Sequence, residues 1–506
     1  MSIRRLFNNS FFSIVSKFTN ALIQLISLPI LIKVFGKGEY GLIVIAMSLN
    51  TFIAIIQIGL PTGLTKFVAE WLAEGNRKQL NSAIQTISIF YLAIAFINFI
   101  AISIIALYGT NLFNVNADQI KTLQTLLIIT AITSLLAIPA TALNQLLIGA
   151  QELGFVSRLD IMKNICFAGL VALVYFEPNL LSVTIFYALQ CTLMFMLIPV
   201  KIWRWSHYGS LKMFLPGWHF KEVLPLLKYS LSLVAFSIFI AMADRLRPII
   251  LGIRVPNNTG EALTEYQIIN YIRILLHMIS SSFMGALIPH ISGAVMSGNR
   301  QIYTVTITEG TKYTWVVGAL LGFGIIMLSK EVLTIYVGPE NLSLNMWLII
   351  LVGASLYNFY VTNIASVILS SGKLMPMLFA TATGFVISVL ICWFMTPLYG
   401  VGAVVISVAA YNVINMVITH FWYLPRYFNV NAVHQILHIM LPPVFAGIIM
   451  CFAGRLIINK IGYSNAYINV AIGAICGTVI YISIILISYI HPKEIFKLYS
   501  RIITRK

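Results

Sequence analysis

Charged residues are scarce in this sequence, and acidic residues are the scarcest of them. Only 9% of the 506 residues are charged, and Asp and Glu together number 15. A soluble globular protein carries about 25% charged residues, so the composition excludes an ordinary soluble protein. Hydrophobic residues make up 59% of the chain instead, which is typical of a protein that crosses a membrane many times.

Cysteine is also rare, and its five residues indicate neither a disulfide framework nor a metal site. The nucleotide-binding pattern GxxxxGK[ST] and the metalloprotease pattern HExxH are both absent. The sequence also lacks a recognisable arrangement of a catalytic nucleophile with a general base. We therefore expect no cofactor, no metal and no enzymatic activity. The cysteines lie inside apolar runs, without a CxxC pair or histidines at ligand spacing: Cys166, Cys191, Cys392, Cys451 and Cys476.

The net charge of +17 does not indicate a nucleic-acid partner, because the basic residues are not gathered in one segment. They mark the ends of apolar runs instead. With the N-terminus placed in the cytoplasm, the cytoplasmic side collects twenty of these residues. This asymmetry follows the positive-inside rule and predicts that both termini are cytoplasmic. The outside receives seven: Lys33, Lys37, Lys121, Arg254, Lys330, Arg455 and Lys460.

Apolar runs of about 20 residues, each long enough for about 30 Å of hydrocarbon, recur along the whole chain. They predict an all-α polytopic membrane protein with about 14 transmembrane helices. The first run is not a signal peptide, because Lys17 and Asn20 interrupt it and no small-residue cleavage site follows. The predicted spans are residues 10–33, 41–61, 82–108, 121–148, 157–176, 180–203, 223–253, 264–291, 307–329, 344–369, 375–396, 399–423, 434–458 and 466–490.

Short sequence matches recur at nearly one offset and predict an internal duplication. KGEYG after the first span resembles TEYQ after the seventh, and EGNRKQL resembles SGNRQIY. Four matched pairs keep their order, 222 to 228 positions apart: Glu39 with Glu265, Pro61 with Pro289, Gly75 with Gly298, and Ile148 with Ser370. Two six-helix repeats in the same orientation, plus two extra C-terminal helices, follow from this pattern. The predicted parts are an N-terminal half at 1–203, a cytoplasmic amphipathic linker at 204–222, a C-terminal half at 223–423, the extra helix pair at 434–490 and a basic cytoplasmic tail at 491–506.

Polar residues gather on one face of several predicted spans, at spacings of three and four. A cation at the centre of a spanning helix costs about 2.5–3.5 kcal/mol on insertion scales, so such residues should face protein or water. We expect them to line a central cavity that binds a substrate. The candidates are Lys17, Asn20 and Gln24 in the first span, Arg245 and Arg247 in the seventh, and Asn270, Arg273 and His277 in the eighth.

Acidic residues near membrane depth are few and leave two alternatives open. Asp244 either neutralises Arg245 or Arg247 as a buried structural pair, or it serves ion coupling, for which Asp160 is the other candidate. Cations exceed acids in the predicted interior. Such a cavity suits an anionic, hydroxyl-rich cargo, since Arg and Lys bind phosphate oxygens while amide and hydroxyl side chains bind sugar hydroxyls.

The motif GKGEYG (residues 36–41), the IGL after the second span, the EYQ after the seventh and the 6 + 6 + 2 helix plan resemble the bacterial polysaccharide flippases called Wzx. These belong to the multidrug/oligosaccharidyl-lipid/polysaccharide exporter superfamily. The resemblance implies flipping of polyprenyl-diphosphate-linked oligosaccharide units across the bacterial cytoplasmic (inner) membrane by alternating access, for surface polysaccharides such as the O-antigen of lipopolysaccharide. The implied partners are the lipid-linked oligosaccharide, membrane lipid, a polysaccharide polymerase and a chain-length regulator. The extra helices would guide the lipid tail or simply pack.

Two other functions remain as alternatives. A cation-coupled multidrug exporter of the same superfamily would need an acidic cavity, whereas this predicted interior is basic. A membrane enzyme of polysaccharide assembly would be favoured by a large outside loop or by acidic sugar-nucleotide motifs, and the sequence has neither. We therefore favour the flippase function over both of these alternatives.

Overall fold

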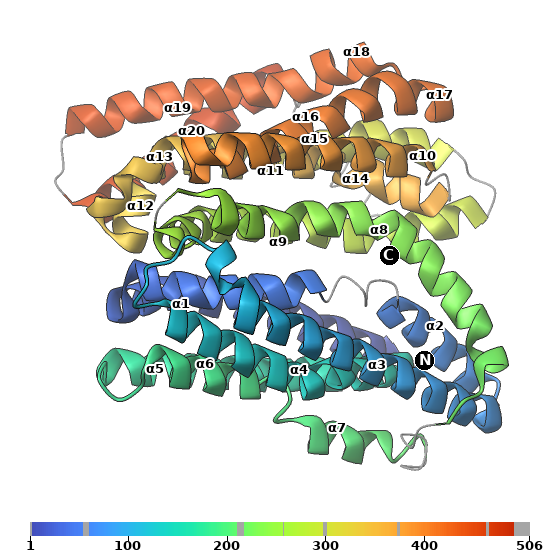
Figure 1. Ribbon diagram of the computed structural model, residues 1–506. Helices are drawn as coiled ribbons and strands as arrows, with labels where there is room; N and C mark the ends of the chain where they lie inside the picture. Colours follow the sequence, from blue (N-terminus) through green and yellow to red (C-terminus); the bar gives the residue numbers. More distant parts are fainter. Residues whose placement is uncertain are drawn as a thin grey trace. The chain divides into compact units, whose positions relative to one another are not determined.

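The computed structural model describes residues 3–53, 60–209, 217–256, 258–296, 301–371, 375–461 and 465–489. Within these ranges the regular structure is helical and contains no strand, which confirms the predicted all-α class. The chain divides into two compact units (helices labelled in Figure 1). The first unit is Met1–Tyr266 with Cys392–Val401, and the second is Gln267–Ile391 with Gly402–Lys506.

The first unit holds the N-terminal helices, the start of α9 and the last residues of α15. Its elements are α1 (Ile3–Ile53), α2 (Leu60–Ala73), α3 (Arg77–Ile104), η2 (Ile105–Gly109), η3 (Thr110–Leu112), α4 (Ile120–Gly149), α5 (Leu153–Phe176), α6 (Val183–Thr192), α7 (Ile198–Trp205) and α8 (Phe220–Arg254).

The second unit continues α9 and holds the C-terminal helices. Its elements are α9 (Thr259–Met296), α10 (Gln301–Val305), η5 (Thr306–Gly310), α11 (Thr311–Met327), α12 (Ser329–Val337), η6 (Pro339–Leu344), α13 (Asn345–Ser355), α14 (Tyr357–Ser371), α15 (Met375–Tyr399), α16 (Val401–Val417), η7 (Ile418–Tyr423), α17 (Leu424–Phe428), α18 (Ala432–Gln435), η8 (Ile436–Met440), α19 (Leu441–Ile461) and α20 (Ala466–Ser488).

Ten helical segments of the described residues are long and apolar enough to cross a membrane. In addition, α8 and α9 have 35 and 38 residues, more than the about 20 that one crossing needs. The multi-pass architecture is therefore confirmed. The count of 14 spans stays a prediction, as do the repeat boundaries. The predicted tail at 491–506 and part of the predicted linker, residues 210–216, lie outside the described residues.

The first long helix is broken at Gly36. This residue has φ 80° and ψ 160°, a backbone conformation outside the helical region. Glycine adopts it at little cost because it has no Cβ, whereas other residues do so rarely. The chain thus changes direction inside the GKGEYG motif, in agreement with the predicted separation of the first two spans.

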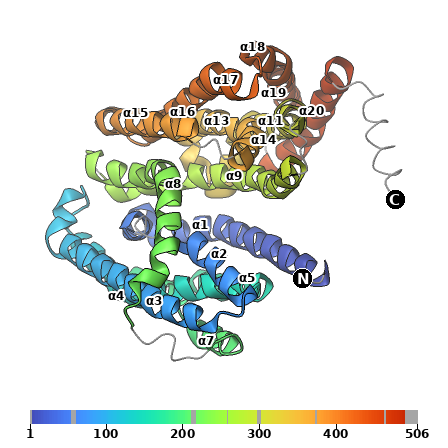
Figure 2. The same cartoon turned by 90° about the vertical axis from the view of Figure 1, so that its right-hand side faces the viewer.

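The predicted sixth span, residues 180–203, is not one continuous helix. It is divided into α6 and α7 by turns at residues 193–197. Pro199 stands in the first turn of α7, where its missing N–H costs nothing, while a longer helix would need that donor. In α7, Trp205 is buried and Trp203 is 60% exposed. Figure 2 shows this short amphipathic helix at the edge of the first unit.

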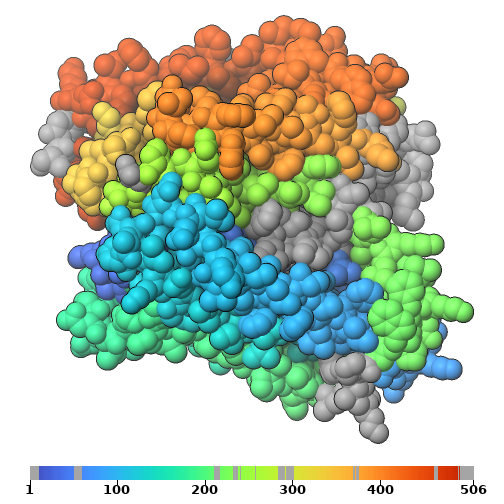
Figure 3. All heavy atoms as spheres, viewed as in Figure 1, coloured from blue at the N-terminus to red at the C-terminus, as the bar shows by residue number. Residues whose placement is uncertain are grey.

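Long helices pack side by side in the first unit. α1 packs along α5, and α3 packs along α4 (Figure 1). A buried core joins α2, α3 and α4 to α7 and α8. α3 and α4 also form much of the face seen in Figure 3, and their outer side chains are large and apolar, as lipid requires. The exposed ones include Leu92, Phe96, Ile132 and Leu136, each between 47% and 57% exposed.

In the second unit the last two helices are firmly docked. Glycines on α19 face large side chains of α11, since a Cβ added at Gly447 would lie 2.2 Å from the ring of Phe323. An ion pair also joins α19 to α12, with 2.7 Å between Arg455 Nη1 and Glu331 Oε1. Backbone approach and charge therefore both hold the extra helix pair against the rest of the unit.

Candidate functional site

The predicted polar face of the first span is present on α1. The side chains of Lys17 and Asn20 are exposed on the surface of the first unit, and that of Gln24 is half-buried. Gln24 Nε2 donates a hydrogen bond to Asn20 Oδ1 at 2.9 Å. Within the described part of the chain, Lys17 has no hydrogen bond or ion pair. The amide pair is thus ordered by its own helix, one turn along from the lysine.

The polar face of α1 is separate from its apolar exposed face. With about 100° between successive residues, Lys17 and Asn20 fall within about 60° of each other. Phe18 and Ile26 lie about 100° and 180° away from Lys17 on the same count. Both are more than half exposed, at 55% and 58%. α1 therefore presents a polar face and an apolar face along the same helical turns.

The predicted polar face of the eighth span lies on α9, within the second unit. Arg273 Nε donates to Asn270 Oδ1 at 2.8 Å. Asn270 is 8% exposed, and His277 is exposed one turn further on. A buried amide thus fixes the orientation of the guanidinium. Because α1 and this part of α9 belong to different compact units, their convergence on one cavity stays a prediction.

The charged residues of α8 form a local ion pair. Arg247 Nη1 lies 2.9 Å from Asp244 Oδ1, with the arginine side chain 2% exposed and the carboxylate 50% exposed. This geometry favours the structural alternative for Arg247, because a buried guanidinium needs a charge partner. Arg245 is half-buried. A cargo-binding role for Arg245 and Arg247 stays a prediction.

Asp160 is paired in a similar way on α5. Lys163 Nζ lies 3.3 Å from Asp160 Oδ1, and both side chains are more than a third exposed. Such an exposed pair contributes less than about 1 kcal/mol to stability. Both candidates for ion coupling, Asp160 and Asp244, thus have a basic partner within one helical turn, and their coupling role stays a prediction.

Two helix backbones cross closely where the second half of α1 meets the start of α9, a contact that lies entirely within the first unit. A Cβ added at Gly41 would lie 1.9 Å from the carbonyl oxygen of Gly260, and one added at Gly260 would lie 2.3 Å from the carbonyl oxygen of Gly38. These glycines therefore permit a contact that no other residue allows. We call residues 37–41 and 259–265 the glycine crossing.

Polar contacts reinforce the glycine crossing. Thr264 Oγ1 donates to the carbonyl oxygen of Lys37 at 2.7 Å, and Lys37 Nζ lies 3.7 Å from Glu265 Oε1. Asn114, which follows η3, donates from Nδ2 to the carbonyl oxygen of Val255 in the loop before α9 at 2.7 Å. These contacts join α1 just after its break, the segment after η3, and the connection between α8 and α9.

An apolar cavity of about 440 Å³ lies within the second unit. It is lined by residues of α11, α13, α14 and α16 together with the first residues of the extra pair, η8 and α19. Trp315 is one of the lining residues, and its indole N–H donates to the carbonyl oxygen of Met440 at 2.9 Å. Among the residues that the structure describes, no cluster of three or more metal-ligating side chains occurs.

A comparison with family models decides the relationship of this chain. The model described as polysaccharide biosynthesis protein matches residues 6–295, more than half of the sequence. The chain belongs to the polysaccharide biosynthesis protein family. Among curated proteins, no match was found. The resemblance of the GKGEYG and EYQ motifs to polysaccharide flippases is thus confirmed at the level of the family.

Several solved structures share the fold of this chain. The lipid II flippase MurJ in an inward closed conformation is 15% identical, with a TM-score of 0.71 over 98% of this chain and 100% of that one. An inward-facing multidrug resistance MATE family transporter of the MOP superfamily is 12% identical, with a TM-score of 0.60 over 80% and 93%. A MOP superfamily transporter from Pyrococcus furiosus is 14% identical, with a TM-score of 0.54 over 82% and 93%. The chain therefore has the MOP transporter fold.

Sequence reasoning about this family member missed the glycine crossing, the apolar cavity and the pairing of Asp160 with Lys163. It did offer the pairing of Asp244 with Arg247 as one of two alternatives. A signal for the crossing is present, since GKGEYG and TGEALTEY each place glycines a few residues from a charge. The repeat comparison aligned Glu39 with Glu265 as equivalents. The structure instead brings Glu265 to Lys37, two residues before that equivalent. Residues at equivalent positions of the two repeats are therefore not necessarily the residues that contact each other.

Proposed function

We propose that this protein flips polyprenyl-diphosphate-linked oligosaccharides across the bacterial cytoplasmic membrane for surface polysaccharide synthesis. The observation that carries the proposal is the α1 surface, where Lys17, Asn20 and Gln24 stand beside an apolar exposed stripe over the same turns. A lipid-linked sugar has the same two characters. Its diphosphate and hydroxyls need polar partners, while its prenyl chain stays in hydrocarbon.

The basic residues suit the charged part of this cargo. Arg273 is held by Asn270, so its guanidinium loses less conformational freedom when it binds a phosphate. Lys17 carries a charge on the exposed polar face of α1. Ionised hydrogen-bond donors bind phosphate oxygens about twice as strongly as neutral donors do. The amides of Asn20 and Gln24 suit sugar hydroxyls, which both donate and accept.

The apolar cavity of about 440 Å³ in the second unit suits the lipid tail. Its walls are mostly apolar and include Met440 and Val444 at the start of the extra helix pair. This placement supports the expectation that the extra helices guide the tail. A segment of prenyl chain there would keep the cargo's hydrocarbon out of water while its head group crosses.

The glycine crossing supports alternating access in this proposal. It joins α1 to the start of α9 by a backbone contact, a hydrogen bond and an ion pair at one end of the first unit. On the predicted topology this end is the outer one. A flippase must open that end to release its cargo, so the crossing would separate once in each cycle. The proposed cycle needs a polysaccharide polymerase and a chain-length regulator downstream to consume the product.

The test uses purified protein in liposomes with a fluorescent polyprenyl-diphosphate oligosaccharide placed on one face. We expect protein-dependent exposure of the label on the other face, lost in Arg273→Ala and partly retained in Arg273→Lys. A phospholipid with a fluorescent head group serves as the control cargo. We expect that the protein does not increase the rate at which this phospholipid crosses the bilayer. No protein-dependent exposure, together with proton- or sodium-driven efflux of organic cations, would identify a multidrug exporter of the MOP superfamily instead.

A further inference from the structure

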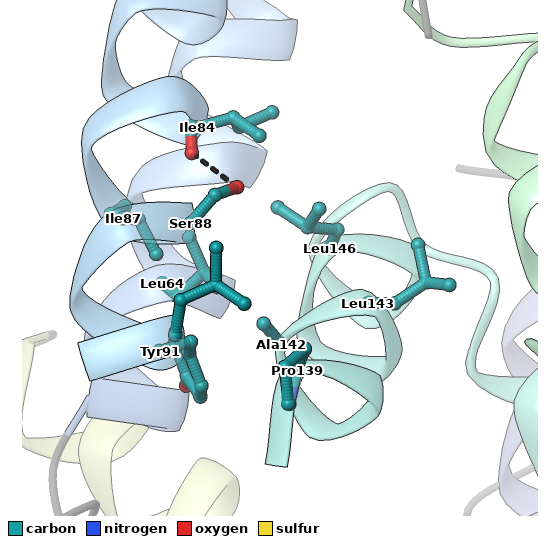
Figure 4. Close-up of a pocket in the computed structure, with 10 residues that line it drawn as sticks. Leu64, Ile84, Ile87, Ser88, Tyr91, Pro139, Ala142, Leu143 and Leu146 are labelled. Carbon is teal, nitrogen blue, oxygen red and sulfur yellow. Dashed lines mark hydrogen bonds between the residues drawn. The ribbon is translucent and has the colours of Figure 1, made fainter. Parts of the chain in front are cut away.

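A second apolar cavity lies within the first unit, far along the chain from every residue proposed to bind cargo. Its volume is about 170 Å³. Figure 4 shows its walls, with side chains of α3 on one side and of α4 on the other. We call it the α3–α4 cavity. It is lined by Leu64, Ile84, Ile87, Ser88, Tyr91, Leu92, Pro139, Ala142, Leu143 and Leu146.

The lining is mostly hydrocarbon, and its side-chain polar groups are the hydroxyls of Ser88 and Tyr91. Ser88 Oγ donates to the carbonyl oxygen of Ile84 at 2.8 Å, so its hydrogen-bonding need is met inside α3 (dashed line in Figure 4). An engineered cavity of about 150 Å³ with a comparable lining stays dry and takes up benzene. The α3–α4 cavity is of similar size. A water molecule needs two or more polar partners, and among the lining side chains only the Tyr91 hydroxyl is left unpaired, so the cavity favours hydrocarbon over water.

Two residues of α4 help to account for the cavity. Pro139 lies inside this helix, and a proline inside a helix removes one backbone hydrogen bond and is a common cause of kinks. One turn later, Ala142 contributes only a methyl group to the wall. α3 and α4 pack closely elsewhere. The local gap thus coincides with a proline and an alanine in α4.

The cavity opens toward the lipid-facing side of the two helices. Leu92 belongs to its lining and is 47% exposed. Phe96 on α3 and Leu136 on α4, one turn from lining residues, are 57% and 52% exposed. A mouth among large apolar side chains that face outward is in contact with the bilayer. Lipid chains are the hydrocarbon available there.

We propose that the α3–α4 cavity binds a fatty acyl chain of a membrane phospholipid. An empty cavity costs free energy in proportion to its volume, and a chain entering from the side removes that cost. On the predicted topology, the lining residues of α3 start about 10 Å from its cytoplasmic end at Arg77, counting about 1.5 Å per residue. The chain thus comes from the cytoplasmic leaflet. This inference does not depend on the proposed cargo.

Photo-crosslinking tests the proposal on the full-length protein. The protein is reconstituted with a phospholipid that carries a diazirine in the middle of one acyl chain, irradiated, and digested for peptide mapping. We expect labelling of residues 84–92 and 139–146. Ala142→Phe fills the cavity and should reduce this labelling at least fivefold. Ile132→Phe is the matched control, because it adds the same ring to the exposed face of α4 outside the cavity.

Each other outcome overturns the proposal. Labelling that is unchanged by Ala142→Phe would show that the probe reacts from the bilayer surface only. Labelling by a diazirine-bearing polyprenyl phosphate, with none from the phospholipid, would assign the cavity to a prenyl chain. Absence of labelling from both probes would leave the cavity empty. If Ala142→Phe does not reach the membrane, Ala142→Leu gives the same comparison with a smaller change.

Discussion

Replacing Gly41 with alanine tests the glycine crossing directly. The new Cβ would lie 1.9 Å from the carbonyl oxygen of Gly260 and 2.3 Å from its Cα. Non-bonded heavy atoms prefer about 3.5 Å or more, so the two backbones must separate by roughly 1.5 Å. Neither partner atom belongs to a flexible side chain that could move aside. The strain falls on the helices themselves.

The cost can be worked out from the contacts that separation breaks. Overpacking of a close contact costs about 1–3 kcal/mol. The hydrogen bond from Thr264 to the Lys37 carbonyl, 2.7 Å long, would stretch beyond bonding distance and lose about 1 kcal/mol. The ion pair between Lys37 and Glu265 is partly exposed and adds little. The total of about 2–4 kcal/mol weakens the closed crossing roughly 30- to 1,000-fold.

A cross-linking assay reads this change. Cysteines at positions 37 and 265, in a background without the native cysteines, are joined in liposomes by a short bismaleimide. We expect much slower joining in Gly41→Ala than in its parent. Gly169→Ala on α5 is the control, because a Cβ there meets nothing within 4 Å. Equal joining in parent and Gly41→Ala, with equal melting temperatures, would refute the reasoning.

Three further predictions concern single side chains. Tyr91→Phe should raise the free energy of unfolding by about 1 kcal/mol, measured by thermal melting in nanodiscs, because the buried hydroxyl has no partner in the described chain. Asp244→Asn should lower it by about 1–3 kcal/mol, because it removes the charge partner of buried Arg247; an unchanged melting temperature would contradict this. Lys17→Ala should reduce cargo flipping at least tenfold while Lys33→Ala, about 160° around the same helix, should not; equal rates in the liposome assay would remove Lys17 from the cargo path.

Local features of the fold could be predicted from the sequence, because they depend on residues close together in the chain. The break at Gly36 follows from a glycine between two apolar runs. The polar face of α1 follows from the spacing of Lys17, Asn20 and Gln24, and the hydrogen bond within that face joins residues four apart. A helix repeats every 3.6 residues, so such patterns carry over directly into structure.

Other features could not be predicted, because they depend on which helices meet. Gly41 and Gly260 are ordinary glycines until two backbones cross at them. Arg247 looked equivalent to Arg245 in the sequence, but the Arg247 side chain is almost fully buried beside Asp244, whereas Arg245 is only half-buried. The break in the sixth span was missed for a different reason. Hydropathy is continuous through residues 193–197, and Pro199 alone gave little warning of a turn.

The docking of α19 has a consequence for how this protein can be divided. The predicted duplication would make twelve helices a complete unit and the last two an addition. Yet Gly447 receives the ring of Phe323, and Arg455 pairs with Glu331, whose side chain is only 11% exposed. Deleting the last two helices would expose the Phe323 ring, which packs against Gly447. It would also remove Arg455, the cation that pairs with the Glu331 carboxylate. In hybrid proteins built from members of this family, the second repeat and the final two helices should therefore be exchanged together.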